Sequence, residues 1–310
     1  MTRSAVKLPL VSVVMPSFNQ APFLEEALES VLSQDYPHVE LIVRDGGSTD
    51  GSVGIIEKYS PRLAFWASQR DRGQCDAINQ GFEQSTGEIM CWLNSDDLLE
   101  PGAISAVVEH FRMQPDSMVV TGSCLCVDEA GTLIHRDTKK PLDGGDSRDA
   151  LRAAGSSEGA QNLVVWFRDW FPQSSTFWRR AIWERVGPLD EAWNYSMDYE
   201  LWRRMSRHSR IDVIDRVLSR YRYHSDAKCI VSTWGPMREV LEINRRDMPA
   251  LEFSEFAESA IRFLIDRIED RERRVGQLDA ELDAVRESKR YRLGSALLGP
   301  IAFLRRGLRR

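Results

Sequence analysis

The chain has 310 residues, of which 42% are hydrophobic and 28% charged, and its formal net charge is -6 at pH 7. This length allows one large domain with a full core, with or without appendages, and the composition is that of a water-soluble protein. The net negative charge gives no overall attraction to nucleic acid. Five cysteines without a zinc-binding spacing favour reduced thiols, and no signal-peptide pattern is recognisable, so we expect a cytoplasmic protein.

Four short apolar segments alternate with helical patterns along the first hundred residues. Strands are predicted at 10–15, 39–43, 63–67 and 88–93, and amphipathic helices at 22–34 and 75–84. This alternation predicts an α/β protein with a mainly parallel sheet flanked by helices. Ligands bind such sheets at the carboxyl ends of the strands, and each of these ends carries a cluster of Pro, Gly, Asn or Asp.

The fourth apolar segment ends abruptly at Asn94-Ser95-Asp96-Asp97. Two adjacent carboxylates at the end of a buried strand repel each other unless a cation or a proton neutralises them. Mg²⁺ or Mn²⁺ bound by carboxylates keeps coordination positions for phosphate oxygens and water. The alternative is that Asp96 and Asp97 only cap a following helix.

The cluster Asp45-Gly46-Gly47-Ser48 also has two interpretations. It satisfies the rules for a tight turn, and its glycines would equally allow a base or ribose to approach the backbone. No G-x-G-x-x-G fingerprint and no P-loop motif occurs, which disfavours Rossmann dehydrogenases and P-loop enzymes. The loop at Pro16 also lacks the Gly-rich run that sugar nucleotidyltransferases place after their first strand.

Taken together, four motifs resemble those of family 2 inverting glycosyltransferases with the GT-A fold. They are Pro16-Ser17-Phe18-Asn19, Arg44 to Asp50, Asp71-Arg72-Gly73-Gln74 with Ala77 to Gly81, and Asn94 to Asp97. The motifs occur in the expected order, and the similarity covers about residues 9 to 225. It implies a nucleotide-diphosphate-sugar donor, most often a UDP-sugar, and a divalent metal ion, Mn²⁺ or Mg²⁺.

The resemblance also implies roles for individual residues. Asp97 is the expected main metal ligand, with Asp96 and His224 as further ligands. Asn94 departs from the family pattern because it occupies the first position of the usual acidic triplet, where an amide lowers the negative charge. The residues expected to bind the donor are Pro16, Ser17, Asn19, Asp45, Gly46, Asp71, Gln74, Asn94 and Asp96.

Further along, we expect a helix from Pro101 to Met113 and strands near 118–127 and 132–136. Residues 139–159 are rich in Gly, Ser, Asp and Ala, which predicts a mobile loop or short helical insertion where acceptor recognition could vary. Aromatic residues are dense from 166 to 183. Most of them are expected in the core, with one or two against the acceptor.

The stretch from Met197 to Trp202 resembles the start of the family helix that presents the catalytic base. Inversion requires a carboxylate that takes the proton of the acceptor hydroxyl. Asp198 matches the base position and Glu200 is its rival, while the alternative for Asp198 is a helix N-cap. A metal ion would stabilise the leaving diphosphate, so no protein general acid is required.

Residues 211–214 and 217–224 predict sheet. His224 follows the last of these strands, where relatives place a histidine near the metal or the diphosphate. Arg222 and Lys228 are expected phosphate partners.

The C-terminal third has a different pattern. Apolar residues at 261, 264, 268, 275, 278, 282 and 285 form an a/d heptad seam that Arg271 interrupts, which predicts a coiled coil or a long docked helix. Basic residues flank an apolar run at 293–304 that is too short to span a bilayer. This pattern favours the anionic inner face of a membrane, and a disordered basic tail is the alternative.

The predicted organisation is a GT-A domain at 1–230, C-terminal helices at 231–288 and a basic amphipathic tail at 289–310. The predicted function is that of a metal-dependent inverting hexosyltransferase. It would transfer a sugar to a glycan or lipid-linked glycan in surface polysaccharide synthesis, in the cytoplasm or at the inner membrane surface. We expect a homo-oligomer through the C-terminal helix and no nucleic acid partner. The alternative is a catalytically silent sugar-nucleotide-binding or scaffold protein.

Overall fold

The computed structural model describes residues 8–137, 171–225, 227–228 and 235–287. The predicted loop at 139–159, the tail at 289–310, and the aromatic residues Trp166, Phe167 and Trp170 lie outside the described residues. The chain divides into two compact units, Met1–Phe256 and Ala257–Arg310.

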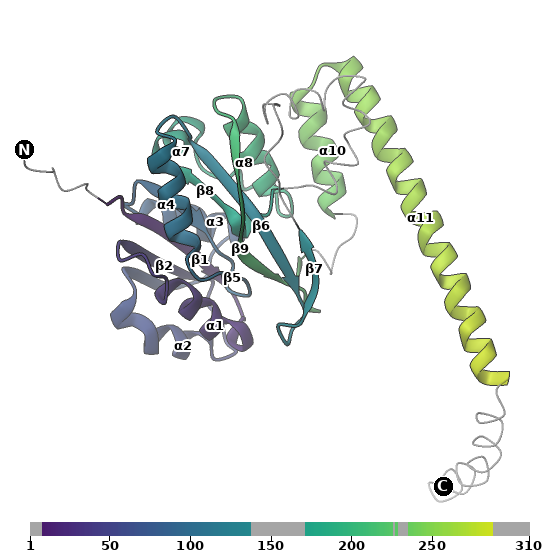
Figure 1. Cartoon of the computed structure of the whole chain (residues 1–310), viewed down its shortest axis with the longest axis horizontal. Coiled ribbons are helices and arrows are strands. Elements are labelled where there is room, and N and C mark those ends of the chain that lie inside the picture. Colours follow the sequence, from purple (N-terminus) through teal and green to yellow (C-terminus); the bar gives the residue numbers. More distant parts are fainter. Residues whose placement is uncertain (1–7, 138–170, 226, 229–234, 288–310) are drawn as a thin grey trace, which may run out of the picture. The chain divides into compact units, whose positions relative to one another are not determined.

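One mixed sheet runs through the first unit (Figure 1). Its strand order is β3-β2-β1-β4-β8-β6-β9-β5, and β7 pairs with β6 outside this path. The strands are β1 Val11–Ser17, β2 Val39–Asp45, β3 Phe65–Ser68, β4 Ile89–Trp92, β5 Leu98–Leu99, β6 Val119–Val127, β7 Leu133–Asp137, β8 Thr176–Arg179 and β9 Ile211–Arg222.

The first four strands form the parallel half of the sheet. Strand β1 pairs in parallel with β2 and β4, and β2 pairs in parallel with β3. The register sets Ser17 opposite Asp45, and Asp45 opposite Ser68. The carboxyl ends of these strands therefore lie at one edge of the sheet, which confirms the predicted α/β architecture.

Helices frame the parallel strands (Figure 1). Helix α3 packs closely on β1 because it carries Gly81, where an added Cβ would lie 2.4 Å from Cγ1 of Val14. The helices are α1 Ala21–Leu32, α2 Ser52–Tyr59, α3 Gln74–Glu83, α4 Ala103–Met113, α7 Arg180–Val186, α8 Met197–Ser206, α10 Gly235–Asp247 and α11 Ala250–Glu287.

Some predicted boundaries differ from the structure. The helix expected from Pro101 begins at Ala103, after Gly102 at a φ of 75°. Strand β5 precedes it and pairs antiparallel with β9, and its two residues are too few to show a sequence period. The two segments expected at 211–224 form one strand, β9, whose register with β6 shifts near Ser123. Helix α2 was not predicted.

Aromatic side chains fill the centre of the core. Trp92 of β4 stacks on Trp202 of α8, with ring centroids 5.7 Å apart, and Trp178 of β8 packs edge-on against both rings. Phe177 is also fully buried. The prediction that part of the aromatic cluster lies in the core is therefore confirmed for Phe177 and Trp178. This packing joins the parallel strands to the helix that carries Asp198.

Within the described part of the chain, no helix combines the length and apolarity needed to cross a bilayer.

Candidate active site

Asn19 joins the loops after β1 and β2 through hydrogen bonds. Its backbone has a φ of 53°, a left-handed conformation that asparagine tolerates better than most residues. The Asn19 amide donates to Ser48 Oγ at 2.8 Å, and the Thr49 amide donates to Asn19 Oδ1 at 2.9 Å. Asn19 therefore fixes the relative position of two loops at the carboxyl edge of the sheet.

Asp45 organises the loop that follows β2. Its buried carboxylate accepts hydrogen bonds from the amides of Gly47 and Ser48, at 3.0 and 2.9 Å, and from Ser68 Oγ at 2.6 Å. A carboxylate buried in this way needs these donors because water cannot reach it. The structure thus supports the tight-turn interpretation, while the predicted role in donor binding stays a prediction.

Three loops meet at Gly46. A Cβ added there would lie 2.9 Å from Oδ2 of Asp71 and 3.2 Å from Cδ2 of Phe18, so only glycine fits without displacement. Phe18 is exposed, and the hydroxyl of Ser17 is buried without a hydrogen-bond partner in the described part of the chain. The Gly46 amide also donates to the carbonyl of Ser17 at 2.8 Å, so the structure brings together Ser17, Gly46 and Asp71 of the predicted donor residues.

Asn94 is the centre of an amide network. Its Oδ1 accepts a hydrogen bond from Gln74 Nε2 at 2.7 Å, and its Nδ2 donates to Oδ2 of Asp97 and Oε1 of Gln173, both at 3.3 Å. Gln173 in turn donates to the carbonyl of Trp92 at 2.6 Å. The network joins the start of α3, the end of β4 and the segment that precedes β8.

The carboxyl group of Asp97 is almost completely buried, at 1% exposure of the residue. Burial raises its pKa well above the usual value and the charge of Asp96 raises it further, while hydrogen bonds from the Arg222 amide and Asn94 oppose the shift. Asp96 itself lies 2.9 Å from Nε2 of His224, measured from Oδ2. The structure therefore brings His224, which follows β9, into contact with Asp96 in the turn after β4, and Asp97 lies in the same turn.

These residues fit a divalent cation in their chemistry. Two adjacent carboxylates and an imidazole are donors that Mn²⁺ and Mg²⁺ sites use, and a cation would relieve the unfavourable charge of buried Asp97. Across the described ranges, no three His, Cys, Asp or Glu side chains are arranged to hold a metal ion. The ligand set stays a prediction.

Arg222 has a different role from the predicted phosphate contact. Its Nε donates to the carbonyl of Asp96 at 3.0 Å, Nη1 to the carbonyl of Glu129 at 2.9 Å and Nη2 to Glu26 at 2.6 Å. The side chain is buried, and its guanidinium lies over the Phe23 ring. Because each of these nitrogens donates to the protein, Arg222 fixes the Asp96–Asp97 turn.

Asp198 lies in the first turn of α8, after Ser196 at the N-cap position. This excludes the N-cap alternative for Asp198. Its Oδ1 accepts a hydrogen bond from the Tyr199 amide at 2.8 Å. Met197, the preceding residue, has its Sδ 3.0 Å from Sγ of Cys75, which follows Gln74. The segments that carry Gln74 and Asp198 therefore lie side by side.

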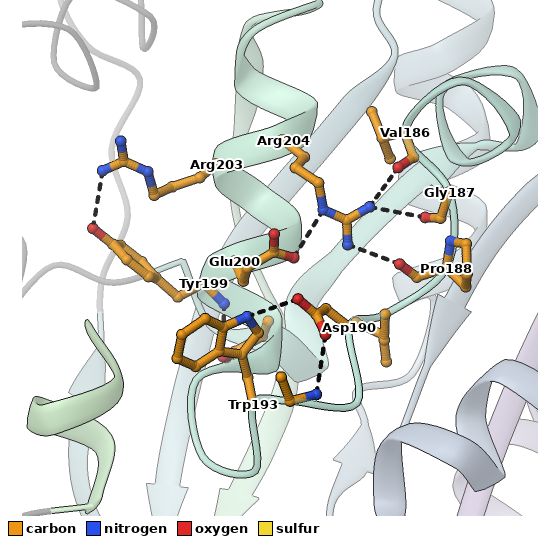
Figure 2. Close-up of polar contacts among 12 residues, drawn as sticks. Val186, Gly187, Pro188, Asp190, Trp193, Tyr199, Glu200, Arg203 and Arg204 are labelled. Atoms are coloured by element: carbon orange, nitrogen blue, oxygen red, sulfur yellow. Dashed lines mark hydrogen bonds and ion pairs between the residues drawn. The ribbon is translucent and has the colours of Figure 1, made fainter. Parts of the chain in front are cut away.

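Glu200, the rival for the role of base, is committed to structural ion pairs. It is 2% exposed, and it accepts hydrogen bonds from Arg204 Nε at 2.8 Å and Arg246 Nη2 at 2.9 Å. Figure 2 shows Arg204 reaching from Glu200 to the carbonyls of Val186, Gly187 and Pro188. Glu200 thus joins α8 to the turn after α7, which favours Asp198 over it as base.

Glu239 was not identified from the sequence. This residue of α10 accepts hydrogen bonds from the amides of Asn194 at 2.9 Å and of Tyr195 and Ser196 at 2.7 Å. Amides at a helix N-terminus lack helical partners and favour a negative charge. Glu239 therefore holds the N-terminus of α8, and nothing local in the sequence signals a contact 43 residues away.

The family model described as glycosyl transferase family 2 matches residues 12–185, more than half of the chain. The chain belongs to this family. The match contains all four motifs between Pro16 and Asp97 as well as Gln173.

Several curated proteins are similar to this chain. An uncharacterised glycosyltransferase of Nostoc sp. is 30% identical over 189 residues, covering 58% of this chain and 54% of that protein. Chondroitin synthase of Escherichia coli is 28% identical over 203 residues, covering 64% of this chain and 27% of that protein. A GalNAc(5)-diNAcBac-PP-undecaprenol beta-1,3-glucosyltransferase of Campylobacter jejuni is 30% identical over 140 residues, covering 44% of each. The chain spans between 27% and 65% of the length of these and similar relatives.

Solved structures support the GT-A fold of this family 2 chain. TarS residues 1–349 from S. aureus, in complex with UDP-GlcNAc, has a TM-score of 0.58 at 17% identity, covering 82% of this chain and 73% of that one. The mannosyltransferase PcManGT from Pyrobaculum calidifontis, in complex with GDP-Man and Mn2+, has a TM-score of 0.56 at 19% identity, covering 95% and 85%.

Proposed function

We propose that this glycosyltransferase moves a hexosyl group from a UDP-sugar to a hydroxyl of a glycan or lipid-linked glycan, with inversion at the anomeric carbon. The observation that carries the proposal is the Asn94–Asp97 turn. It places two adjacent carboxylates, one of them buried, beside the loops that follow β1, β2 and β3. Such a carboxylate pair can bind a divalent cation, and the cation can in turn bind the oxygens of a diphosphate.

The nucleoside of the donor would lie against the loops joined by Gly46. Pro16 and Ser17 end strand β1 and Asp45 ends strand β2, while Asn19 and Asp71 lie in the loops that follow β1 and β3. The buried Ser17 hydroxyl, without a partner in the described part of the chain, supports a ligand at this place because such groups are usually hydrogen-bonded. Two of the similar solved structures carry UDP-GlcNAc and GDP-Man respectively, and the more frequent use of UDP in the family favours a UDP-sugar here.

A divalent cation, Mn²⁺ or Mg²⁺, would be held by Asp97 and Asp96, with His224 as a further ligand. When bound, it supplies Lewis-acid stabilisation of the negative charge on the leaving diphosphate. Arg222 contributes through its amide, which donates to Oδ1 of Asp97, and through its guanidinium, which donates to the carbonyl of Asp96.

Asp198 would act as the catalytic base. The acceptor hydroxyl oxygen forms a bond to the anomeric carbon while its proton passes to the Asp198 carboxylate. The bond between the anomeric carbon and the diphosphate oxygen breaks, and its electron pair leaves with the nucleoside diphosphate. The contact between Cys75 and Met197 keeps the start of α8 beside α3. The stacking of Trp202 on Trp92 joins α8 to β4, and Glu239 of α10 holds the N-terminus of α8.

The acceptor class rests on the resemblance and on the names of relatives. The Campylobacter relative is named for action on an undecaprenol-linked glycan, and the Escherichia coli relative for chondroitin synthesis. We propose a comparable role in surface polysaccharide synthesis at the inner face of the cytoplasmic membrane.

Two substitutions test the proposed roles. Asp97→Asn and Asp198→Asn should each lower the rate of sugar transfer at least about a hundredfold, because each removes the negative charge required for metal binding or proton transfer. Sugar transfer is measured with the donor that a nucleotide-sugar screen identifies, and folding is checked by circular dichroism. Asp116→Asn is a control, because Asp116 is exposed in the turn between α4 and β6. Folded variants that both retain near wild-type transfer rates would contradict the proposal.

A further inference from the structure

Helix α11 carries a stripe of exposed apolar side chains in the second unit. Ile261, Val275, Leu278 and Leu282 are 55%, 58%, 47% and 46% exposed. Their spacings of 14, 3 and 4 residues fit one seam of a heptad repeat, with Ile261, Val275 and Leu282 at position a and Leu278 at position d. Apolar groups aligned in this way gain free energy when a partner covers them.

The charged residues that flank the seam identify the partner. In a parallel two-stranded coiled coil, position g of one helix faces position e of the next heptad in the other helix. Arg274 occupies g and Asp279 the following e, so two copies in register would pair opposite charges on both sides of the seam. The sequence repeats this complementarity at Arg267 with Glu272 and at Glu281 with Arg286.

An antiparallel pair would not have this match. There, position g faces position g and position e faces position e. An antiparallel register centred on Arg274 would bring Arg274 against Arg274, and the register that sets Val275 against Leu278 would bring Glu272 against Asp279. Like charges in such positions destabilise the pair. The seam also places the β-branched residues Ile261, Ile268 and Val275 at position a, which favours two strands, while Arg271 at a d position lowers stability and specifies register.

We propose that residues 261–287 pair with the same segment of a second copy of this chain, in parallel and in register, as a two-stranded coiled coil. Each chain carries both the g and the e residue of these pairs, so the surface is complementary to that of a second copy. The proposal does not depend on the reaction that the first unit catalyses.

Sedimentation equilibrium of the full chain tests the assembly. The expected result at about 10 to 100 µM is a species of twice the chain mass of 35.4 kDa. Leu278→Lys, which puts a charge in the seam, should give a monomer with unchanged circular dichroism of the first unit, because Leu278 is half exposed in the single chain. A wild-type monomer or trimer, or a dimer that survives Leu278→Lys, would overturn the proposal.

Charge exchange tests the parallel register. Arg274→Glu and Asp279→Arg should each raise the dimer dissociation constant about tenfold, because each turns two attractive pairs into repulsive ones. The double variant should regain wild-type affinity, and an equimolar mixture of the two single variants should form a heterodimer. Arg273→Glu is the matched control, since Arg273 occupies the outward position f and lies 3.8 Å from Glu269 of its own helix. Single variants that dimerise like wild type, or a double variant that fails to recover, would exclude the parallel pairing.

Discussion

At the level of single residues, the contacts of Asn94 explain why an asparagine rather than an aspartate suits this position. An asparagine in place of the first carboxylate of the acidic triplet lowers the charge of the site, as the sequence indicates. The structure adds a second reason, because the Asn94 amide nitrogen faces two acceptors, Oδ2 of Asp97 and Oε1 of Gln173. An aspartate has no donor to offer to either.

Asn94→Asp should therefore lower the free energy of unfolding by roughly 1–3 kcal/mol in metal-free buffer, since it removes two hydrogen bonds and adds a negative charge beside buried Asp97. Urea denaturation with and without EDTA measures the effect. Asn94→Ala, which removes the hydrogen bonds without adding charge, separates the two contributions. Equal stability of Asn94→Asp and wild type at neutral pH would contradict the described network.

Asp76 lies two residues after the predicted donor-binding residue Gln74, and its carboxyl group makes the stability of the fold depend on pH. Burial raises its pKa, but hydrogen bonds from Gln80 and from the amide and guanidinium of Arg72, together with the charge of Arg72, outweigh burial and lower the pKa from 3.8 to about 2. A carboxyl with a lowered folded-state pKa stabilises the fold above its unfolded-state pKa, and this contribution is lost as the pH falls through the folded-state value.

The stability difference between wild type and Asp76→Asn should accordingly narrow by roughly 1 kcal/mol as the pH falls from about 5 to about 2, after allowance for the exposure of Arg72. Urea unfolding at a series of pH values measures it. Glu109→Gln is a surface control, because Glu109 pairs with Arg112 on an exposed face of α4. A difference in unfolding free energy that stays constant across this pH range would contradict the stabilisation of the Asp76 carboxylate by Gln80 and Arg72.

At the level of elements, the position of α8 depends on α10. Glu239 of α10 accepts hydrogen bonds from three backbone amides just before α8. Arg246, also of α10, donates a hydrogen bond to Glu200 of α8. Tyr199 also donates from its hydroxyl to Asn244 at 2.8 Å. The helix with the proposed base is therefore positioned by a segment that lies outside the residues matched by the family model.

Glu239→Ala should lower kcat at least about tenfold and the free energy of unfolding by about 1–3 kcal/mol, because three amides lose a charged acceptor. The Michaelis constant for the donor should change little, since Glu239 lies on the base side of the site. Glu242→Ala is the control, as Glu242 pairs with exposed Arg238 on the same helix. Equal losses of kcat in both variants, or none in either, would contradict a positioning role for Glu239.

The elements also show what the sequence can and cannot predict. The buried strands and their polar ends follow from local patterns, so the parallel half of the sheet and the residues at its edge were predictable. The roles of Glu239, Arg222 and Gln173 depend on partners more than 40 residues away. No local period signals such contacts, and β5 owes its existence to pairing with β9.

At the level of the whole molecule, the first unit combines two halves that meet near Gln74. Strands β1 to β4 carry the residues predicted to bind the donor, and α8 carries the predicted base. Cys75 and Asn79 of α3 contact the segment that leads into α8, through the carbonyl of Trp193 at 3.2 Å and the backbone of Leu189 at 2.9 Å. Burial raises the pKa of the Cys75 thiol to about 12, so this residue is a packing group and not a reactive thiolate.

The most direct measurement is calorimetric titration of UDP, GDP and dTDP into the protein, each with Mn²⁺, Mg²⁺ or EDTA. We expect UDP to bind at least about tenfold more tightly with metal than with EDTA, because Asp97 and Asp96 need a cation between themselves and a diphosphate. Asp97→Asn should remove the metal dependence and leave the fold intact. Failure of well-folded protein to bind any of the nucleotides would contradict the proposed donor site and would favour a scaffold role for the chain.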